Sequence, residues 1–443
     1  MIDERIFKAY DIRGTYPDQI NGEAAYEIGK AFASYVGDAI VVGRDMRESS
    51  AEIFENFVRA INEMGVDVVD LGLCTTPMLN FVVAHKNFKG GAMITASHNP
   101  ANYNGIKLIG EKAVQLNKER GISQIKELVF KNGLKSAENK GAISTEDILG
   151  EYLNYICSKI GEVKPLKLVV DCGNGVAGIS ASPAFERLGF DVEKMYFEPD
   201  GTFPNHQPNP AEDKNLKDCE NKVLEVGADL GIVFDGDGDR AFFVDKQGRT
   251  HNPGFLLAAI ADQELKGKEG QKVYYDLRFS KGVVETIEKA GGIAVKTKVG
   301  NPFFKEQLIM GGGLMAAEYS GHFMYGEHYG LDDGLFSALK VISWMSKTGQ
   351  TFSEFLAPYE AGRFVTGEIN FEVEDPQKSI ERLEDEFKDG KIDHLDGVTI
   401  EYDDWWVNLR ASNTEPVVRL NIEANSEQLL NEKKEAIIKI VKG

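Results

Sequence analysis

Three aspartates alternate with two glycines in the stretch Asp235-Gly236-Asp237-Gly238-Asp239. Because the carboxylates stand at positions i, i+2 and i+4, an extended loop can point all of them at one ion, and the glycines let the backbone curl around it. Ligands that are all oxygen favour Mg²⁺, Ca²⁺ or Mn²⁺ over zinc or copper. Carboxylates this close repel one another unless a cation neutralises them. The stretch therefore predicts a metal-binding loop with Asp235, Asp237 and Asp239 as ligands.

An EF-hand loop also begins with alternating aspartates, and it is the competing interpretation. That loop needs Gly at its sixth position and Glu at its twelfth. Counted from Asp235, these positions hold Arg240 and Lys246. The EF-hand is therefore excluded.

A reactive serine is the second pattern. The hexapeptide Thr95-Ala96-Ser97-His98-Asn99-Pro100 follows the apolar run Gly91-Ala92-Met93-Ile94. Asn99 can form a side-chain turn to its own backbone, and Pro100 fixes φ and stops the strand from continuing. We therefore expect Ser97 to point out of the end of a strand. An isolated serine of this kind is more often part of an ordinary surface turn, so its interpretation depends on the rest of the chain.

Two further stretches suit a polar substrate. Arg410-Ala411-Ser412-Asn413-Thr414-Glu415-Pro416, with Arg419 after it, combines guanidinium, hydroxyl and turn amide groups that fit the oxygens of a phosphate. Glu318-Tyr319-Ser320-Gly321-His322 offers two groups that can recognise hydroxyls, and a histidine. These stretches predict binding of a phosphate and of hydroxyl groups.

One arrangement of elements occurs three times and would position these residues. A short apolar strand ends in a polar loop, a helical stretch follows, and a second strand ends in another polar loop. Strands alternating with helices imply mainly parallel α/β sheets, whose ligand groups lie at the carboxyl ends of strands. The expected strand pairs are 39–42 with 92–94, 168–170 with 230–234, and 273–275 with 313–316, and the first helix is expected at 51–64. The second strand of each pair ends just before Ser97, Asp235 and Glu318.

The last part of the chain differs, because charged helices and short alternating strands predict an α+β module. Helices are expected at 380–388 and 427–441, and strands at 398–402, 405–409 and 417–422. The fold class is therefore α/β, with three related α/β modules whose sheets are mixed and mainly parallel, plus a C-terminal α+β domain. The predicted domains are 1–145 with the Ser97 loop, 146–249 with the metal loop, 250–363 with the Glu318 loop and 364–443 with the Arg410 loop. The second domain is expected to open with a helix at 146–160.

Composition limits the class of protein. A chain of 443 residues is too long for one core, since domains have about 100 to 200 residues. No run of about 18 apolar residues could span a bilayer, and the first residues have no apolar segment of a signal peptide, so a cytoplasmic protein without a membrane partner is expected. The four cysteines contain no C-x-x-C pair, which argues against zinc and disulfides and predicts buried thiols: Cys74, Cys157, Cys172 and Cys219.

The formal net charge is −20, which would repel a nucleic acid backbone, so no nucleic acid partner is expected. An anionic substrate would then need a local basic pocket. Basic residues that could form it occur in short motifs: Arg13 in Tyr10–Gly14, Lys107 in Asn104–Lys107, Arg240 beside the metal loop, and Arg278.

Taken in order, these motifs resemble those of the α-D-phosphohexomutases, the family of phosphomannomutase and phosphoglucomutase, along essentially the whole chain. The resemblance implies domains around a central cleft and a Ser97 that carries a phosphoryl group. It also implies that Mg²⁺ binds to the three aspartates together with Ser97. The reaction would interconvert hexose 1-phosphate and hexose 6-phosphate, of mannose and/or glucose, with hexose 1,6-bisphosphate as intermediate and activator.

The resemblance also assigns expected roles to single residues. Ser97, Lys107, His322 and Arg13 would be catalytic, with Lys107 and His322 as the candidates for proton transfer. The residues expected to bind substrate are Tyr10, Arg13, Arg240, Arg278, Glu318, Ser320, His322, Arg410, Ser412, Asn413, Thr414 and Arg419.

Some positions depart from the family pattern or suggest other functions. Gly173-Asn174-Gly175-Val176-Ala177-Gly178 fits a dinucleotide fingerprint, but the family has a glycine-rich turn here for close helix packing, which we favour. Asn301 stands where the family usually has histidine, so a substrate contact made by that histidine is in doubt. Tyr319 stands where phosphoglucosamine mutases usually have glutamine. Two alternatives stay open: a phosphoglucosamine mutase, and a sugar-phosphate-binding protein without turnover. The protein is expected to be a monomer or a dimer.

Overall fold

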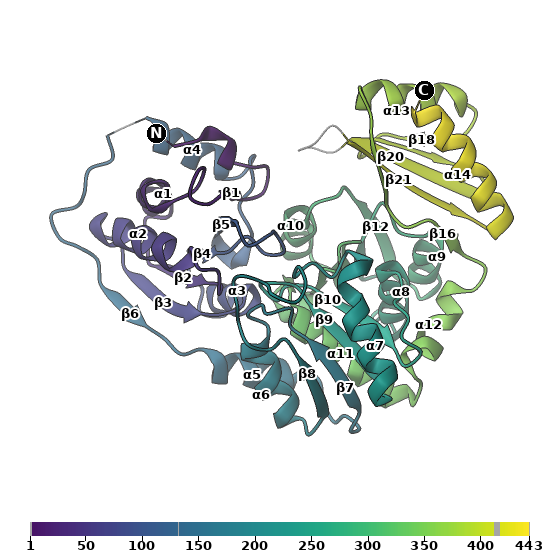
Figure 1. The fold of residues 1–443 in the computed structure, drawn as a ribbon, viewed down its shortest axis with the longest axis horizontal. Coiled ribbons are helices and arrows are strands. Elements are labelled where there is room, and N and C mark those ends of the chain that lie inside the picture. The colour runs from purple at the N-terminus through teal and green to yellow at the C-terminus, as the bar shows by residue number, and fades with distance from the viewer. Residues whose placement is uncertain (1, 132, 412–416, 443) are drawn as a thin grey trace. The chain divides into compact units, whose positions relative to one another are not determined.

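The computed structural model describes residues 2–131, 133–411 and 417–442, and these residues form four β-sheets with associated helices (Figure 1). The chain divides into two compact units. The first unit comprises Met1–His251, Gly300–Ala316 and Ser320–Phe355, and the second comprises Asn252–Val299, Ala317–Tyr319 and Leu356–Gly443.

Six strands form the first sheet, in the order β1-β5-β4-β2-β3-β6. Their bounds are Ile12–Thr15 (β1), Ile40–Arg44 (β2), Val68–Leu73 (β3), Gly90–Ile94 (β4), Tyr103–Ile109 (β5) and Ile143–Thr145 (β6). The helices of this part are α1 (Gly22–Val36), α2 (Ser50–Glu63), α3 (Thr76–His85) and α4 (Ile122–Phe130), with short 3-10 turns at Glu4–Ile6 (η1) and Glu111–Ala113 (η2).

Helices cover both faces of the first sheet. Strand β2 runs parallel to β3 and β4, β3 runs parallel to β6, and β5 is antiparallel to β1 and β4. Helices α1, α2 and α4 lie on one face and α3 lies on the other (Figure 1). Sheets covered on both faces need strands that are apolar throughout, and every residue of β4 is buried. The Ser97 loop follows β4 directly.

The second sheet has the order β10-β9-β7-β8. Its strands are β7 (Lys167–Asp171), β8 (Asp191–Met195), β9 (Leu230–Phe234) and β10 (Ala241–Asp245), and its helices are α5 (Leu149–Ser158), α6 (Gly178–Arg187), η3 (Asp213–Leu216) and α7 (Lys217–Val226). Strand β7 is parallel to β8 and β9. Strands β9 and β10 form an antiparallel hairpin in which Phe234 pairs with Ala241, so residues 235–240 are its connection.

The third sheet has the order β12-β11-β13-β14-β15. Its strands are β11 (Lys272–Asp276), β12 (Ile293–Thr297), β13 (Met315–Ala317), β14 (Phe323–Tyr325) and β15 (Leu331–Asp332). The helices are α8 (Pro253–Glu264), α9 (Lys281–Lys289), α10 (Asn301–Gly311), η4 (Gly326–His328), α11 (Gly334–Thr348) and α12 (Phe352–Glu360). The strand expected at 313–316 begins two residues later, because Gly312 and Gly313 have φ values of 63° and 154°, which strand residues do not adopt.

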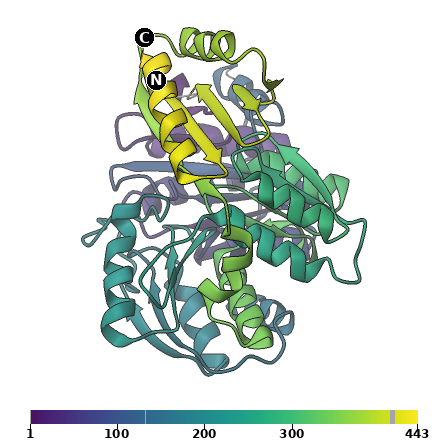
Figure 2. The same cartoon turned by 90° about the vertical axis from the view of Figure 1, so that its right-hand side faces the viewer.

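The C-terminal part is antiparallel, with the strand order β16-β21-β20-β19-β18 and β17 paired to β21. The strands are β16 (Phe364–Val365), β17 (Ile369–Glu372), β18 (Lys391–Asp393), β19 (Val398–Glu401), β20 (Trp405–Ala411) and β21 (Val417–Ala424). Helices α13 (Pro376–Glu386) and α14 (Glu427–Lys442) pack against these strands around one apolar core (Figure 1). Figure 2, where α14 is yellow, shows this helix running alongside the strands.

The predicted fold class, three α/β modules and a C-terminal α+β domain, is confirmed. The prediction of buried thiols is right for Cys74, Cys172 and Cys219 but wrong for Cys157, which is half-buried because it lies near the end of the amphipathic helix α5. Within the described residues, no helix is both long and apolar enough to cross a membrane.

Candidate active site

Ser97 is the first candidate residue, and its backbone is unusual. Its φ is +49°, in the left-handed region that non-glycine residues rarely adopt and that is often found at functional sites. The conformation is held by Thr95, whose Oγ1 accepts a hydrogen bond from the Ser97 N–H at 2.8 Å. Ser97 Oγ donates to Asp235 Oδ2 at 2.9 Å and lies 3.2 Å from His98 Nδ1. The tight turn therefore places the serine hydroxyl against the first aspartate of the other motif.

Arg47 anchors this turn, and sequence reasoning missed it. Its guanidinium donates to the backbone carbonyl oxygens of Ser97 (2.9 Å), Asn99 (2.7 Å), Pro100 (2.7 Å) and Tyr103 (3.0 Å). Its Nε donates to the buried carboxylate of Asp45 at 3.1 Å. A guanidinium has enough donors to satisfy several carbonyls at once, so one side chain fixes the path of the serine loop.

His98 is held neutral beside the serine. Enclosure by the protein lowers its pKa well below the ordinary histidine value, and the nearby cations Arg240, Arg13 and Lys107 lower it further. A neutral imidazole can accept a hydrogen bond from the Ser97 hydroxyl.

The aspartate loop connects the hairpin of β9 and β10 and is almost completely buried. Asp235 accepts backbone hydrogen bonds from Gly238 (3.0 Å) and Arg240 (3.2 Å), which curl the loop around its carboxylate. The first N–H of α11, that of Gly334, donates to the Gly238 carbonyl at 3.2 Å. The positive end of a helix therefore lies beside the three carboxylates, which is favourable for them.

Two cations share the three carboxylates. Lys107 Nζ lies 2.6 Å from Asp237 Oδ2 and 2.7 Å from Asp239 Oδ2, and Arg240 Nε lies 3.0 Å from Asp235 Oδ2. Burial lowers the pKa of Lys107, but Asp237 and Asp239 outweigh it and raise that pKa overall. Burial, together with the charge of Asp239, raises the pKa of Asp235 to about 7. Two cations are thus too few for three buried carboxylates.

The loop fits a hard metal ion. Asp237 Oδ1 is buried and has no hydrogen-bond partner among the described residues, and Asp239 Oδ1 is buried with only His322 Nε2 near it, at 3.4 Å. One oxygen from each of the three aspartates lies within 4.8 Å of the others. An all-oxygen donor set with an unsatisfied buried oxygen suits Mg²⁺, Mn²⁺ or Ca²⁺. A second grouping, Asp239, His322 and Asp332, includes a nitrogen ligand and is therefore less suited to a hard cation that prefers oxygen.

The glycine-rich turn Gly173–Gly178 supports this loop. The Val176 N–H donates to the Gly236 carbonyl at 3.0 Å, and a Cβ on Gly175 would lie 2.7 Å from the same oxygen. A Cβ on Gly178 would lie 2.8 Å from the Phe197 carbonyl oxygen. At Gly175 and Gly178 the backbone packs so closely against its neighbours that there is no room for a side chain. This favours a packing role for the glycine-rich turn over a dinucleotide site.

Ser320 and His322 lie in the same unit as the metal loop. Ser320 Oγ is 2.9 Å from His322 Nδ1, and His322 Nε2 is 3.4 Å from Asp239 Oδ1. The Ser320 carbonyl lies 3.5 Å from Arg240 Nη1. The structure thus brings the predicted histidine to the edge of the aspartate loop.

Asn301, the departure from the family pattern, has a partner of its own. Its Nδ2 donates to Asp332 Oδ2, while its Oδ1 is buried without a hydrogen-bond partner. Asp332 is also paired with the buried Lys305. The side chain that replaces the family's histidine is therefore tied into a buried polar cluster.

Tyr10 and Arg13 are also in the first unit. Arg13 donates to Asn99 Oδ1 at 2.6 Å and pairs with Asp11, so it contacts the serine loop directly. The ring of Tyr10 packs edge-on against Phe303, with centroids 5.6 Å apart.

Arg278 and Glu318 lie in the second unit. Arg278 Nε donates to Asp276 Oδ1 at 2.9 Å, its Nη2 lies 3.7 Å from Glu318 Oε1, and its guanidinium lies over the Tyr319 ring at 5.0 Å. Burial lowers the pKa of Arg278, but Asp276 outweighs it and raises that pKa overall, so the residue is a permanent cation.

Arg410 and Arg419 join Arg278 through a residue that sequence reasoning did not single out. Glu368 Oε2 accepts from Arg278 Nη1 at 2.9 Å and from Arg410 Nη2 at 2.8 Å, and its Oε1 accepts from Arg419 Nη1 at 3.2 Å. Burial raises the pKa of Glu368, but Arg278 and Arg410 outweigh it and lower that pKa to about 2. The other predicted phosphate ligands, Ser412, Asn413 and Thr414, lie outside the described residues.

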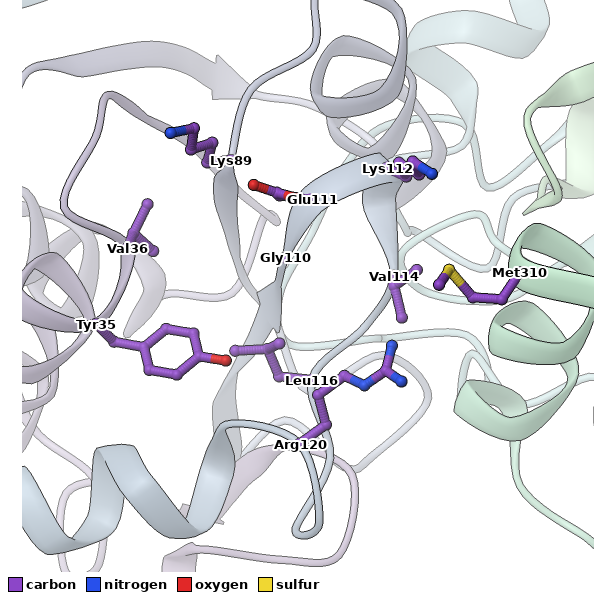
Figure 3. Close-up of a pocket in the computed structure, with 10 residues that line it drawn as sticks. All are labelled: Tyr35, Val36, Lys89, Gly110, Glu111, Lys112, Val114, Leu116, Arg120 and Met310. Atoms are coloured by element: carbon purple, nitrogen blue, oxygen red, sulfur yellow. The ribbon is translucent and has the colours of Figure 1, made fainter.

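A separate pocket of about 370 Å³ lies on the first unit (Figure 3). It is lined in part by Lys89, Lys112, Arg120 and Met310. Lys89 pairs with Asp38, and Arg120 pairs with Glu306. No predicted site residue lines this pocket, so the chemistry belongs elsewhere.

Four family models match successive parts of the chain. Residues 4–136, 150–248 and 252–361 match the phosphoglucomutase/phosphomannomutase alpha/beta/alpha domains I, II and III, and residues 368–440 match the C-terminal domain of the same family.

Relatives and solved structures agree with these matches. A phosphomannomutase/phosphoglucomutase from Pseudomonas aeruginosa is 38% identical over 434 residues, covering 96% of this chain and 93% of the relative. A phosphomannomutase from Escherichia coli is 34% identical over 450 residues, covering 98% and 99%. The crystal structure of a phosphoglucomutase/phosphomannomutase family protein from Burkholderia thailandensis has a TM-score of 0.91 at 31% identity, covering 100% of this chain and 98% of that one. The chain therefore belongs to the phosphoglucomutase/phosphomannomutase family, the α-D-phosphohexomutases, and is a mutase of phosphorylated hexoses.

Proposed function

We propose that Ser97 carries the phosphoryl group in a reaction that interconverts hexose 1-phosphate and hexose 6-phosphate. The observation that carries the proposal is the hydrogen bond from Ser97 Oγ to Asp235, in a loop of three buried aspartates whose Asp237 keeps an unsatisfied buried oxygen among the described residues. A hydroxyl beside a candidate metal site is the arrangement that phosphoryl transfer needs, since this chemistry depends on positioning and charge.

The proposed reaction has two half-reactions. In the first, the bond from phosphorus to Ser97 Oγ breaks while a bond forms from phosphorus to O1 or O6 of a hexose monophosphate; the sugar hydroxyl gives its proton to a protein base, and the released Ser97 Oγ takes up a proton to become a hydroxyl. The hexose 1,6-bisphosphate then turns around. In the second, the Ser97 hydroxyl gives up its proton to a protein base as the other phosphoryl group passes to Ser97 Oγ, and the sugar oxygen that is released takes up a proton.

Magnesium is the proposed ion, held by Asp235, Asp237, Asp239 and Ser97, where it would supply positive charge to the transferring group. Lys107 and His322 are the proposed proton-transfer groups. Lys107 lies between two carboxylates and is fully charged, so it suits stabilisation of charge, whereas His322 has a ring nitrogen that can accept a proton.

The remaining residues are proposed to bind the sugar phosphate. Glu318 and Ser320 would recognise sugar hydroxyls with His322, and Arg278, Arg410 and Arg419 would bind the phosphate that is not reacting. The list of proposed ligands is completed by Tyr10, Arg13, Arg240, Ser412, Asn413 and Thr414. The family matches at 4–136, 150–248, 252–361 and 368–440 support the four proposed domains 1–145, 146–249, 250–363 and 364–443. The cytoplasmic location and a monomer or dimer stay predictions.

Labelling tests the role of Ser97. Enzyme incubated with glucose 1,6-bisphosphate that carries labelled phosphorus should transfer the label to protein, and mass spectrometry should place it on the peptide that contains Ser97. Glucose 1-phosphate should then remove the label as bisphosphate. Label on another residue, or turnover without a labelled protein, would contradict the proposal.

A coupled assay across glucose, mannose and glucosamine 1-phosphates tests the sugar. We expect turnover of glucose and mannose phosphates, because they differ only at C2 and the proposed Glu318 and Ser320 contacts are with O3 and O4. A preference above about a thousandfold, some 4 kcal/mol, would reveal a contact to C2. Faster turnover of the amino sugar would instead support a phosphoglucosamine mutase.

A further inference from the structure

Glu368 occupies a position that no predicted motif includes. It follows Gly367, whose φ is +71°, and directly precedes β17. Both of its carboxylate oxygens are used: Oε2 accepts from Arg278 and Arg410, and Oε1 accepts from Arg419. The side chain is only 15% exposed. One carboxylate is therefore divided among three guanidinium groups that are the proposed ligands of a phosphate.

The three arginines are not compensated equally. Arg278 has a carboxylate of its own in Asp276, to which it donates through Nε and Nη2. Within the described residues, Glu368 is the only carboxylate to which the structure pairs Arg410 and Arg419. The guanidinium groups of Arg410 and Arg419 thus have only the carboxylate of Glu368 between them in the described part of the chain, and Arg278 also bonds to that carboxylate.

Unsatisfied donors lie in the same cluster. The Nε atoms of Arg410 and Arg419 are buried and have no hydrogen-bond partner among the residues that the structure describes. Leaving a buried donor without an acceptor costs about 1 to 3 kcal/mol, and more for a charged group, so such atoms mark the place of an acceptor. Excess positive charge and unsatisfied N–H groups together indicate an anion with several oxygens, such as a phosphate monoester, which carries about −1.5 to −2 at pH 7.

We infer that Glu368 is a positioning residue that sets how strongly the three arginines bind a phosphate. Its carboxylate holds the three guanidinium groups in place and competes with the substrate phosphate for the same N–H groups. This inference rests on the proposed function, in which a bisphosphate must leave one binding mode and enter another during each cycle. Three guanidinium groups without a shared carboxylate would hold the non-reacting phosphate too long, and the carboxylate of Glu368 weakens their binding of it.

The competing explanation is that the hydrogen bonds of Glu368 only hold the three arginines in the orientation that binds phosphate. The two explanations predict opposite signs. If Glu368 competes with phosphate, removing its charge strengthens phosphate binding. If it only holds the arginines in place, removing its charge releases them and weakens phosphate binding.

The test compares Glu368→Gln with the parent and with Glu372→Gln, which removes the same charge from an exposed position in β17. Calorimetric titration with glucose 1,6-bisphosphate gives the Kd in full-length enzymes that all carry Ser97→Ala, so that no phosphoryl group is transferred during the titration, and KM is measured in the same variants with Ser97 intact. We expect the Kd of Glu368→Gln to fall about 3- to 30-fold, its KM for glucose 1-phosphate to fall with it, and the Kd of Glu372→Gln to stay within about twofold. A Kd that rises or does not change in Glu368→Gln overturns the inference.

Two further variants keep the test decisive. Glu368→Asp shortens the side chain by one methylene and keeps the charge, so it should shift the Kd in the same direction by less; a shift in the opposite direction would count against the inference. In an Arg410→Ala background, the effect of Glu368→Gln should be smaller than in the parent, because one of the three guanidinium groups for which Glu368 competes with phosphate is gone. An undiminished effect there would place the bisphosphate elsewhere and overturn the inference.

The outcome is separable from that for the proposed function. If the parent enzyme does not transfer label to Ser97, the proposed function fails whatever Glu368 does. If the parent is labelled on Ser97 and Glu368→Gln binds bisphosphate more weakly, only the inference about Glu368 fails.

Discussion

In the first unit, three buried carboxylates share the two cations Lys107 and Arg240, whereas in the second unit the guanidinium groups of Arg278, Arg410 and Arg419 share the carboxylate of Glu368. The unsatisfied buried atoms differ accordingly. Among the described residues, they include a carboxylate oxygen of Asp237 and one guanidinium nitrogen of Arg240 in the first region, and they are the guanidinium Nε atoms of Arg410 and Arg419 in the second. The first region lacks a cation and the second lacks an anion.

Under the proposed function, this difference separates two tasks. A region that is short of positive charge would bind a metal ion, which would then attract a phosphoryl group. A region that is short of negative charge would bind a phosphate without reacting with it. Loss of a group from the first region should therefore affect kcat most, and loss of a group from the second should affect binding.

The largest effect is expected for Ser97→Ala. Without the hydroxyl, no group of the first region can carry the phosphoryl group between half-reactions, so kcat should fall by more than about 10⁴-fold, equivalent to about 5.5 kcal/mol. The coupled mutase assay measures this, and thermal unfolding checks that the fold is kept. Turnover within tenfold of the parent would show that the serine is not the carrier.

Metal removal, or Asp237→Asn, should rank second. The cation acts on charge that develops in the transition state, so kcat should fall about 10³-fold while the Kd of the hexose phosphate changes less than about fivefold. Asp213→Asn, an exposed aspartate in η3, is the matched control. Full activity after treatment with EDTA and removal of metal would refute the metal assignment.

The third-largest effect is expected for Arg47→Met, and it should be a loss of folding stability. The change leaves the buried carboxylate of Asp45 and four backbone carbonyls without their donor. Breaking a buried pair on one side costs about 3 to 5 kcal/mol, so the free energy of unfolding in urea should fall by that amount. The exposed Arg59→Met serves as control, and an equal loss in both variants would remove the special role of Arg47.

The smallest effect is expected in the second region. Arg410→Ala removes one charge-assisted hydrogen bond to phosphate, worth about 1.5 to 3 kcal/mol, so kcat/KM should fall about 10- to 100-fold. Steady-state kinetics measure it beside Lys388→Ala, which removes one exposed charge from the same domain. A fall in kcat as large as that of Asp237→Asn would mean that the two regions do not divide binding and chemistry.

Local patterns in the sequence predicted much of both regions. The aspartate loop and the serine turn are contiguous, so their residue types and spacing carry the information, and strands β4 and β9 before them are apolar throughout. Arg410 and Arg419 were predicted as phosphate ligands from one motif and the residues just after it, and the structure places both in the second region.

What the sequence could not reveal depends on long-range contacts. Arg47 acts on carbonyl groups 50 to 56 residues away, and Glu368 acts on guanidinium groups 42 to 90 residues away. Nothing in the type or spacing of either residue distinguishes it from a surface charge. Only the hydrogen bonds formed after the sheets assemble show that Arg47 is buried and that Glu368 joins three cations.

The left-handed backbone of Ser97 has a consequence for how this position can evolve. A glycine there would relieve conformational strain of about 1 kcal/mol, but it would lose the hydrogen bond from the serine hydroxyl to the buried Asp235, which is of similar size. Selection for activity must retain the serine, because glycine has no hydroxyl. The hydroxyl thus offsets the backbone strain at residue 97 and is also the group that the proposed reaction needs, so a Ser97→Gly enzyme should be inactive.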